Sequence, residues 1–112
     1  MKLLTKEIET LLEKHPFGSQ DNTLPFEKKV LVKFFNPYGV GTWIIVEAEK
    51  QDDGDWLMFG LAEIGYGYEW GYVSFEELNE LRVPPFGLPI ERDKYLKKNC
   101  LVKDLVRESE MM

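Results

Sequence analysis

Residues 30–63 read VLVKFFNPYGVGTWIIVEAEKQDDGDWLMFGLAE, and the alternation of apolar runs and turn residues in this stretch predicts the fold class. Three runs, at 30–35, 42–49 and 56–63, are rich in the β-branched and aromatic residues typical of strands. Turn-forming residues at 36–39 and 51–55 separate the runs. Because both connections are too short for a parallel crossover, the strands are predicted to form antiparallel hairpins.

Helical patterns flank these strands. Apolar residues recur at helical spacing over 3–14, which predicts an amphipathic helix whose apolar stripe packs on the sheet. A polar loop at 16–29 follows and is long enough to be mobile. After a short fourth strand at 70–73, Ser74 and Glu77 form a capping box that opens a helix over 75–81.

The rest of the chain is predicted to be less regular. Prolines at 84, 85 and 89 favour an extended, irregular segment, and the tail at 101–112 has only weak helical spacing. We therefore expect one α+β domain over 1–112, with an antiparallel meander of about four strands packed with an N-terminal helix and a short helix after the last strand.

Composition excludes several classes of protein. No apolar run reaches the roughly 18 residues needed to cross a bilayer, so no membrane span is expected. The first residues lack the apolar core of a signal peptide. Cys100 is the only cysteine, which rules out a disulfide framework and a thiolate cluster. A reducing cytoplasm is the expected compartment, and the chain is expected to be a monomer or a homodimer.

The acidic residues are concentrated in the middle of the sequence. Residues 47–80 contain ten acids against Lys50 alone, whereas the net charge of the whole chain is −6. Such a block repels nucleic-acid phosphates and attracts basic protein surfaces, so no direct nucleic-acid binding is expected. Solubility alone explains the number of acids but not their segregation.

No residue pattern indicates catalysis. His15 is the only histidine, and it follows a predicted helix end where a cation is favoured by the helix dipole. The acids at 52–55 resemble a fragment of a calcium loop but lack its glycine and glutamate spacing, so a charged hairpin tip is the better interpretation. We expect no enzyme activity, no metal and no cofactor.

Two further candidates are weighed against structural roles. Glu91 and Asp93 flank Arg92 and have the composition of an acid/base pair of a weak hydrolase, yet alternating charge on an edge segment favours a salt-bridged staple. Cys100 follows two lysines that would lower the pKa of its thiol, but the sequence places no histidine near it.

The segment GYGYEWGY at 65–72 is the most unusual one. Exposed aromatic residues on a glycine-rich loop are typical of protein-binding hot spots, and the lack of lysine and arginine argues against base stacking. Tyr66 and Tyr68 are candidate contacts with a partner, whereas Tyr72 is expected to face the core.

Several blocks, in order along the chain, resemble a family of short bacterial domains of unknown function carried on plasmids, conjugative elements and phages. These blocks are VKFFNP at 32–37, TW at 42–43, FGL at 59–61, GYVSFEEL at 71–78 and LPIERD at 88–93. The resemblance covers about 30–93 and leaves the leading helix and the basic tail outside. It implies a mobile-element context, which includes anti-restriction and anti-CRISPR inhibitors.

The charge and this context together lead to a functional hypothesis. We expect an inhibitor of a bacterial defence nuclease, of the Cas9 type, that occupies the basic nucleic-acid-binding surface of that effector. The alternative is an accessory protein of plasmid maintenance or conjugation with no defence role. The predicted partner-binding residues are Glu63, Tyr66, Tyr68, Glu69, Glu76, Glu77 and Glu80.

Overall fold

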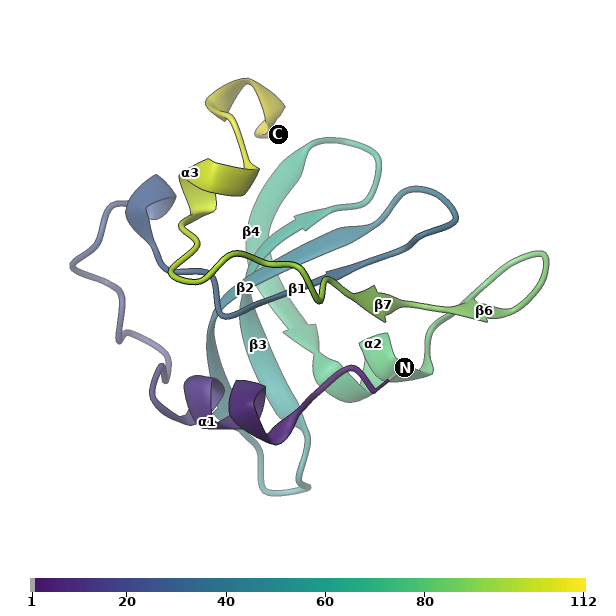
Figure 1. The fold of residues 1–112 in the computed structure, drawn as a ribbon, viewed down its shortest axis with the longest axis horizontal. Coiled ribbons are helices and arrows are strands. Elements are labelled where there is room, and N and C mark those ends of the chain that lie inside the picture. Colours follow the sequence, from purple (N-terminus) through teal and green to yellow (C-terminus); the bar gives the residue numbers. More distant parts are fainter. Residues whose placement is uncertain (1) are drawn as a thin grey trace.

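The architecture is a five-stranded antiparallel sheet covered on both faces by short helices and loops (Figure 1). The structure is a computed structural model, and it describes residues 2–112. The sheet has the order β4-β3-β2-β1-β7, and its strands are β1 (Val32–Phe35), β2 (Thr42–Lys50), β3 (Trp56–Glu63), β4 (Tyr68–Ser74) and β7 (Glu91–Arg92). The predicted fold class is therefore confirmed, with a meander formed by the first four of these strands.

Each face of the sheet carries its own apolar cluster. On one face, α1 (Lys6–Glu13) and α2 (Phe75–Glu80) cover a cluster that includes Phe34, Ile45 and Met58. On the other face, η1 (Pro25–Glu27) and α3 (Val102–Leu105) cover a cluster that includes Ile44 and Leu61. A last turn, η2 (Glu108–Glu110), lies two residues before the end of the described chain. Both faces are buried because side chains alternate along each strand and both sets are apolar.

The predicted helices form with shifted boundaries. The first begins at Lys6 because the Thr5 side chain caps it by accepting a hydrogen bond from the Ile8 N–H at 3.2 Å. Leu3 and Leu4 are buried but precede the helix. The apolar stripe packs on the sheet, as predicted, with Leu12 fully buried.

The segment after α2 is more regular than predicted. Residues 84–89, expected to be irregular, lie in a small hairpin of β5 (Arg82–Val83) and β6 (Leu88–Pro89). β7 then pairs antiparallel with β1 as a fifth strand that the sequence did not predict. Strands of two residues carry too little periodicity to be recognised, so only the pairing partner reveals them.

The loop at 16–29, expected to be mobile, is tied to β2. The Gln20 side chain donates to the Val46 carbonyl at 2.8 Å and to the Lys29 carbonyl at 3.0 Å, and it accepts from the Lys29 N–H at 2.7 Å. The buried Glu47 carboxylate accepts from the backbone N–H groups of Gly18 and Gln20. Polar residues here satisfy backbone groups, which is why a polar loop is ordered.

A β-bulge in β2 brings the Glu47 carboxylate to that loop. The register with β3 shifts between Ile45 and Glu47, so residues 44–48 are all buried instead of alternating. Glu47 is only 4% exposed. It therefore acts as an internal hydrogen-bond acceptor and adds nothing to an exposed acidic surface, contrary to the sequence-based expectation for the acidic block.

Candidate protein-binding surfaces

The seven residues predicted to bind a partner lie in two separate places. Three of them, Glu76, Glu77 and Glu80, are exposed on α2. The other four belong to the β3–β4 hairpin at the far end of these strands: Glu63, Tyr66, Tyr68 and Glu69. The acids of 47–80 thus form no single wall, because the two ends of an eight-residue strand separate them.

We name the first place the acidic end, which consists of Asp52, Asp53, Asp55, Glu76, Glu77 and Glu80. Asp55 links the acids of the β2–β3 turn to those of α2. Its carboxylate accepts a hydrogen bond from the Ser74 hydroxyl and another from the Glu76 N–H at 2.9 Å. Ser74 also caps α2 by accepting from the Glu77 N–H at 3.2 Å, as predicted, whereas the reciprocal bond of the expected capping box, from the Ser74 N–H to the Glu77 side chain, is not formed.

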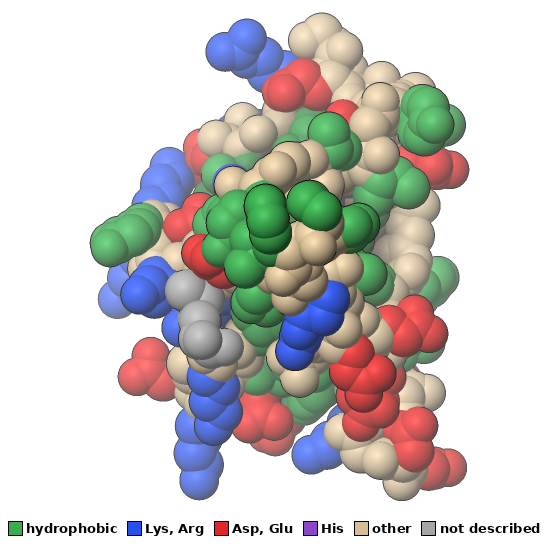
Figure 2. All heavy atoms as spheres, turned by 90° about the vertical axis from the view of Figure 1, so that its right-hand side faces the viewer, with side chains coloured by type: hydrophobic (Ala, Val, Ile, Leu, Met, Phe, Trp, Pro, Cys, Tyr) green, Lys and Arg blue, Asp and Glu red, His purple; other side chains and the backbone are tan. Residues whose placement is uncertain are grey.

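The carboxylates of the acidic end lie close enough to repel one another. The pKa of Glu76 is raised above its ordinary value mainly by the negative charge of Asp55, with smaller contributions from burial, Asp53 and Glu80. Figure 2, seen from the right-hand side of Figure 1, shows Asp and Glu side chains gathered at the lower right of this face. Acidic residues from two distant parts of the sequence therefore share one surface.

No lysine or arginine among residues 2–112 forms an ion pair with the acidic end. The ion pairs among residues 2–112 link Lys33 with Asp93, Lys97 with Asp104 and Lys103 with Glu27. None of them involves an acid of residues 47–80. The charge of the acidic end is thus available to a partner.

Glu63, in contrast, stabilises the turn between β3 and β4. Its carboxylate accepts hydrogen bonds from the backbone N–H groups of Gly65 and Gly67, the latter at 3.0 Å. Gly65 and Gly67 both have positive φ, of 121° and 98°. A carboxylate occupied by two backbone donors is a turn-forming group, so Glu63 has a structural role that the sequence did not reveal.

The three tyrosines of the hairpin have different environments. Tyr66 is 77% exposed. Tyr68 packs partly against the second apolar cluster, and burial is the main reason that the pKa of its phenol is raised. Tyr72, expected in the core, is 65% exposed and lies edge-on to Phe17 with ring centroids 5.5 Å apart. The prediction for Tyr72 was wrong because both faces at the edge strand β4 are incompletely covered.

A hollow of about 320 Å³ lies on the α2 side of the sheet, across β2, β3 and β4. The strand register explains it. One cross-strand row runs from Trp43 over Ala62 to Glu69, and the next row runs from Ile45 over Gly60 and Gly71. Because Ala62 and Gly71 have little or no side chain, the space above them stays empty, whereas the place of a Gly60 side chain is taken by the Ile44 backbone of β2.

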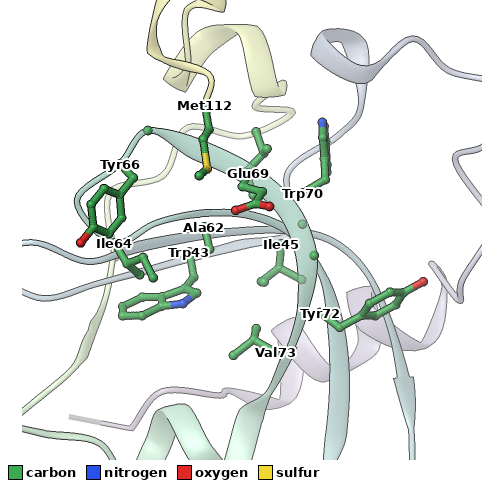
Figure 3. Close-up of a pocket in the computed structure, with 14 residues that line it drawn as sticks. Trp43, Ile45, Ala62, Ile64, Tyr66, Glu69, Trp70, Tyr72, Val73 and Met112 are labelled. Carbon is green, nitrogen blue, oxygen red and sulfur yellow. The ribbon is translucent and has the colours of Figure 1, made fainter.

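Large side chains surround this hollow. Trp43 and Ile45 form one wall, and Val73, Ile64 and Tyr66 lie around the mouth (Figure 3). Figure 3 also shows the Glu69 side chain on the rim, whereas Trp70 and Tyr72 point away on the other side of β4. We name this feature the aromatic hollow. It is a concave, mostly apolar surface with one carboxylate, a combination typical of binding sites.

The residues weighed as catalytic candidates have structural roles. The His15 ring lies 2.8 Å from the Leu11 carbonyl at the end of α1. Asp93 pairs with Lys33 next to the edge strand β7, as the staple interpretation predicts. Cys100 is buried, and this burial raises the pKa of its thiol against the effect of Lys97, so the expected lowering is not observed.

Residues 2–112 contain no group of three or more histidine, cysteine or acidic side chains arranged to hold a metal ion. None of the helices formed by these residues has the length and apolar composition that crossing a bilayer requires.

One family matches the chain. The sequence pattern of a family described as "Protein of unknown function (DUF2958)" matches residues 3–111. The match is longer than the resemblance expected for 30–93, and it includes the leading helix and the tail. No curated protein and no solved structure shows a significant match.

Proposed function

We propose, from the premise that the chain belongs to the family "Protein of unknown function (DUF2958)", that it is a binding protein whose acidic end docks on a basic surface of a protein partner. The observation that carries this proposal is the set of unpaired carboxylates on α2 and the β2–β3 turn. They raise the pKa of Glu76, and no lysine or arginine among residues 2–112 forms an ion pair with them.

Docking on a basic surface relieves the repulsion within the acidic end. Each lysine or arginine that approaches replaces an unfavourable carboxylate–carboxylate interaction with a favourable one. The interaction is long-ranged, so association is fast at low ionic strength and becomes slower as salt screens the charges. A strong salt dependence of binding is thus the expected signature.

The partner proposed here is the nucleic-acid-binding surface of a bacterial defence nuclease, a Cas9-type effector. Such a surface is rich in arginine and lysine because it holds the phosphates of a guide RNA and a target DNA. Carboxylates of the acidic end take the place of phosphates and exclude the nucleic acid. Segregated negative charge supports this partner, together with the mobile-element context that the sequence resemblance implies.

Co-purification with a Cas9-type effector tests this proposal. The wild-type chain is expected to bind the effector without guide RNA at low salt, and to lose binding when guide RNA is loaded first or when salt is high. A triple charge reversal on α2, Glu76→Lys, Glu77→Lys and Glu80→Lys, is expected to abolish binding while far-ultraviolet circular dichroism shows a folded protein.

A matched control reverses three exposed acids elsewhere. Glu7→Lys, Asp21→Lys and Glu108→Lys change the net charge by the same amount, and all three positions lie outside the acidic end. This control variant is expected to bind. If both triple variants lose binding equally, net charge and not the acidic end is responsible. If the α2 variant still binds, the proposed docking surface is wrong.

If the chain is instead an accessory protein of plasmid maintenance or conjugation, these binding experiments are expected to give a different result. A pull-down from a host lysate then recovers a component of a relaxosome or a replication complex in place of the effector, and the effector is not retained at any salt concentration. That result rejects the nuclease as partner, whereas dependence on Glu76, Glu77 and Glu80 still supports the acidic end as the docking surface.

A further inference from the structure

We infer that the aromatic hollow binds one arginine side chain of the protein partner. This inference rests on the proposed function, because the arginine belongs to the basic surface of the proposed partner. The hollow has the size of a small ligand site, at the lower end of the roughly 300–1,000 Å³ that such sites span. It thus suits a single long side chain.

The first argument is that the hollow is empty for a reason intrinsic to the sequence. A Cβ built on Gly71 would meet no atom within 4 Å, whereas neighbouring positions of the sheet are filled by large side chains. Three small residues, Gly60, Ala62 and Gly71, lie side by side on adjacent strands. A large side chain at Gly71 would extend into this space.

The second argument is the position of Glu69. Its side chain lies on the rim of the hollow (Figure 3), and its carboxylate forms no ion pair or side-chain hydrogen bond with any residue of 2–112. Glu63, the other glutamate of this hairpin, is instead occupied by backbone donors. A free carboxylate beside an apolar hollow favours a ligand with an apolar stem and a positively charged end.

The third argument distinguishes arginine from lysine. The indole of Trp43 lies in the same cross-strand row as Glu69, separated from it by Ala62 alone. A planar guanidinium stacks on an aromatic ring and at the same time donates two parallel hydrogen bonds to a carboxylate. The ammonium group of a lysine is a compact charge. It cannot stack as a plane on the indole, and it cannot donate two parallel hydrogen bonds to one carboxylate.

The fourth argument is that the hollow extends along β4 from the hairpin towards the acidic end. Val73 lines the hollow, and the following residue, Ser74, begins the contact with Asp55 that holds α2. The apolar rim on the opposite side is exposed, with Ile64 and Tyr66 at 64% and 77%. A basic surface that docks on α2 therefore has the hollow within reach, and one arginine inserted there fixes its register.

Titration with a short peptide tests the inference without the partner. The probe is an acetylated and amidated Gly-Arg-Gly peptide, and the readout is the two-dimensional nitrogen–proton spectrum of the chain. The indole N–H of Trp43 and the amide of Gly71 are expected to shift, with a dissociation constant on the order of 10 mM. The matching citrulline peptide, which keeps the shape but lacks the charge, is expected to cause shifts at least about tenfold weaker.

Three variants test the site. Glu69→Gln is expected to weaken arginine-peptide binding about tenfold. Gly71→Leu fills the hollow and is expected to abolish binding, and its thermal unfolding curve shows whether the sheet is intact. Glu7→Gln removes an exposed carboxylate of α1 that does not line the hollow, and this variant is expected to bind as the wild type does.

The outcomes separate this inference from the proposed function. Equal shifts with arginine and citrulline peptides, shifts that leave Trp43 and Gly71 unaffected, or binding that survives Gly71→Leu would overturn the arginine site. Co-purification that depends on α2 would still stand in that case. Conversely, arginine-peptide binding with no effector captured supports the hollow and rejects the nuclease as partner.

Discussion

Substitution of Gly60 is expected to be among the most destabilising single changes in the sheet. Gly60 on β3 faces Ile45 on β2, next to the β-bulge. A Cβ at this position would lie 1.9 Å from the carbonyl oxygen of Ile44 and 2.8 Å from its carbonyl carbon. Both atoms belong to the backbone of the neighbouring strand, so no side-chain rotation relieves the clash and β2 has to move.

The magnitude follows from where β2 lies. It is the central strand, and its two faces contribute Ile45 and Ile44 to the two apolar clusters. Displacing it disturbs both clusters, so we expect Gly60→Ala to cost about 3 kcal/mol, the upper end of the range for overpacking a core. For a chain of this length that loss lowers the midpoint of thermal unfolding by about 13 °C.

Gly71→Ala is the matched comparison. Gly71 pairs with Gly60 in the same cross-strand row, but its Cβ would meet no atom within 4 Å. Replacing it restricts the unfolded chain and is expected to stabilise the protein by about 0.5 kcal/mol, or about 2 °C. Thermal unfolding followed by circular dichroism measures both variants. If Gly60→Ala unfolds within about 2 °C of Gly71→Ala, the close approach of β2 and β3 is refuted.

Further expectations concern three side chains. Glu47→Ala removes the acceptor of two backbone N–H groups in 18–20 and is expected to cost about 2 kcal/mol, with faster hydrogen exchange in that loop; unchanged exchange would contradict this role. Asp55 raises the pKa of Glu76, so protonation of Glu76 relieves the repulsion between the two carboxylates and their contribution to stability improves as pH falls through the raised pKa. Asp55→Asn should return the pKa of Glu76 towards 4.5, which a carbon-13 titration measures. High salt should have the same effect on the pKa. Burial raises the pKa of the Cys100 thiol, so a disulfide reagent should modify it slowly near neutral pH and rapidly in urea; fast labelling of the native protein would show that it is accessible.

Local sequence signals identified the helices and strands that form because of interactions between residues close together in the sequence. The three apolar runs of 30–63 and their turns gave the hairpins, since β-propensity and turn chemistry are short-range properties. Thr5 was not recognised as a helix cap, although its hydroxyl was a detectable signal. Ser74 was recognised, and it caps α2 as expected.

The candidate surfaces were predicted only in part. The acids of α2 and the exposed Tyr66 follow from composition and loop chemistry. The aromatic hollow was missed, because its walls come from three strands. The glycines at 60 and 71 were a visible signal, but their cross-strand pairing appears only once the register is known.

The amino-acid order alone determined that the chain forms hairpins flanked by helices and that its central third is acidic, because propensity and net charge need no contacts. Tertiary structure decided which acids remain exposed. Glu47 is occupied by backbone N–H groups of the distant loop at 16–29 and Glu63 by those of its own turn, whereas the glutamates of α2 stay free beside Asp53. Burial and hydrogen bonding between distant residues depend on chain topology, which no local pattern encodes.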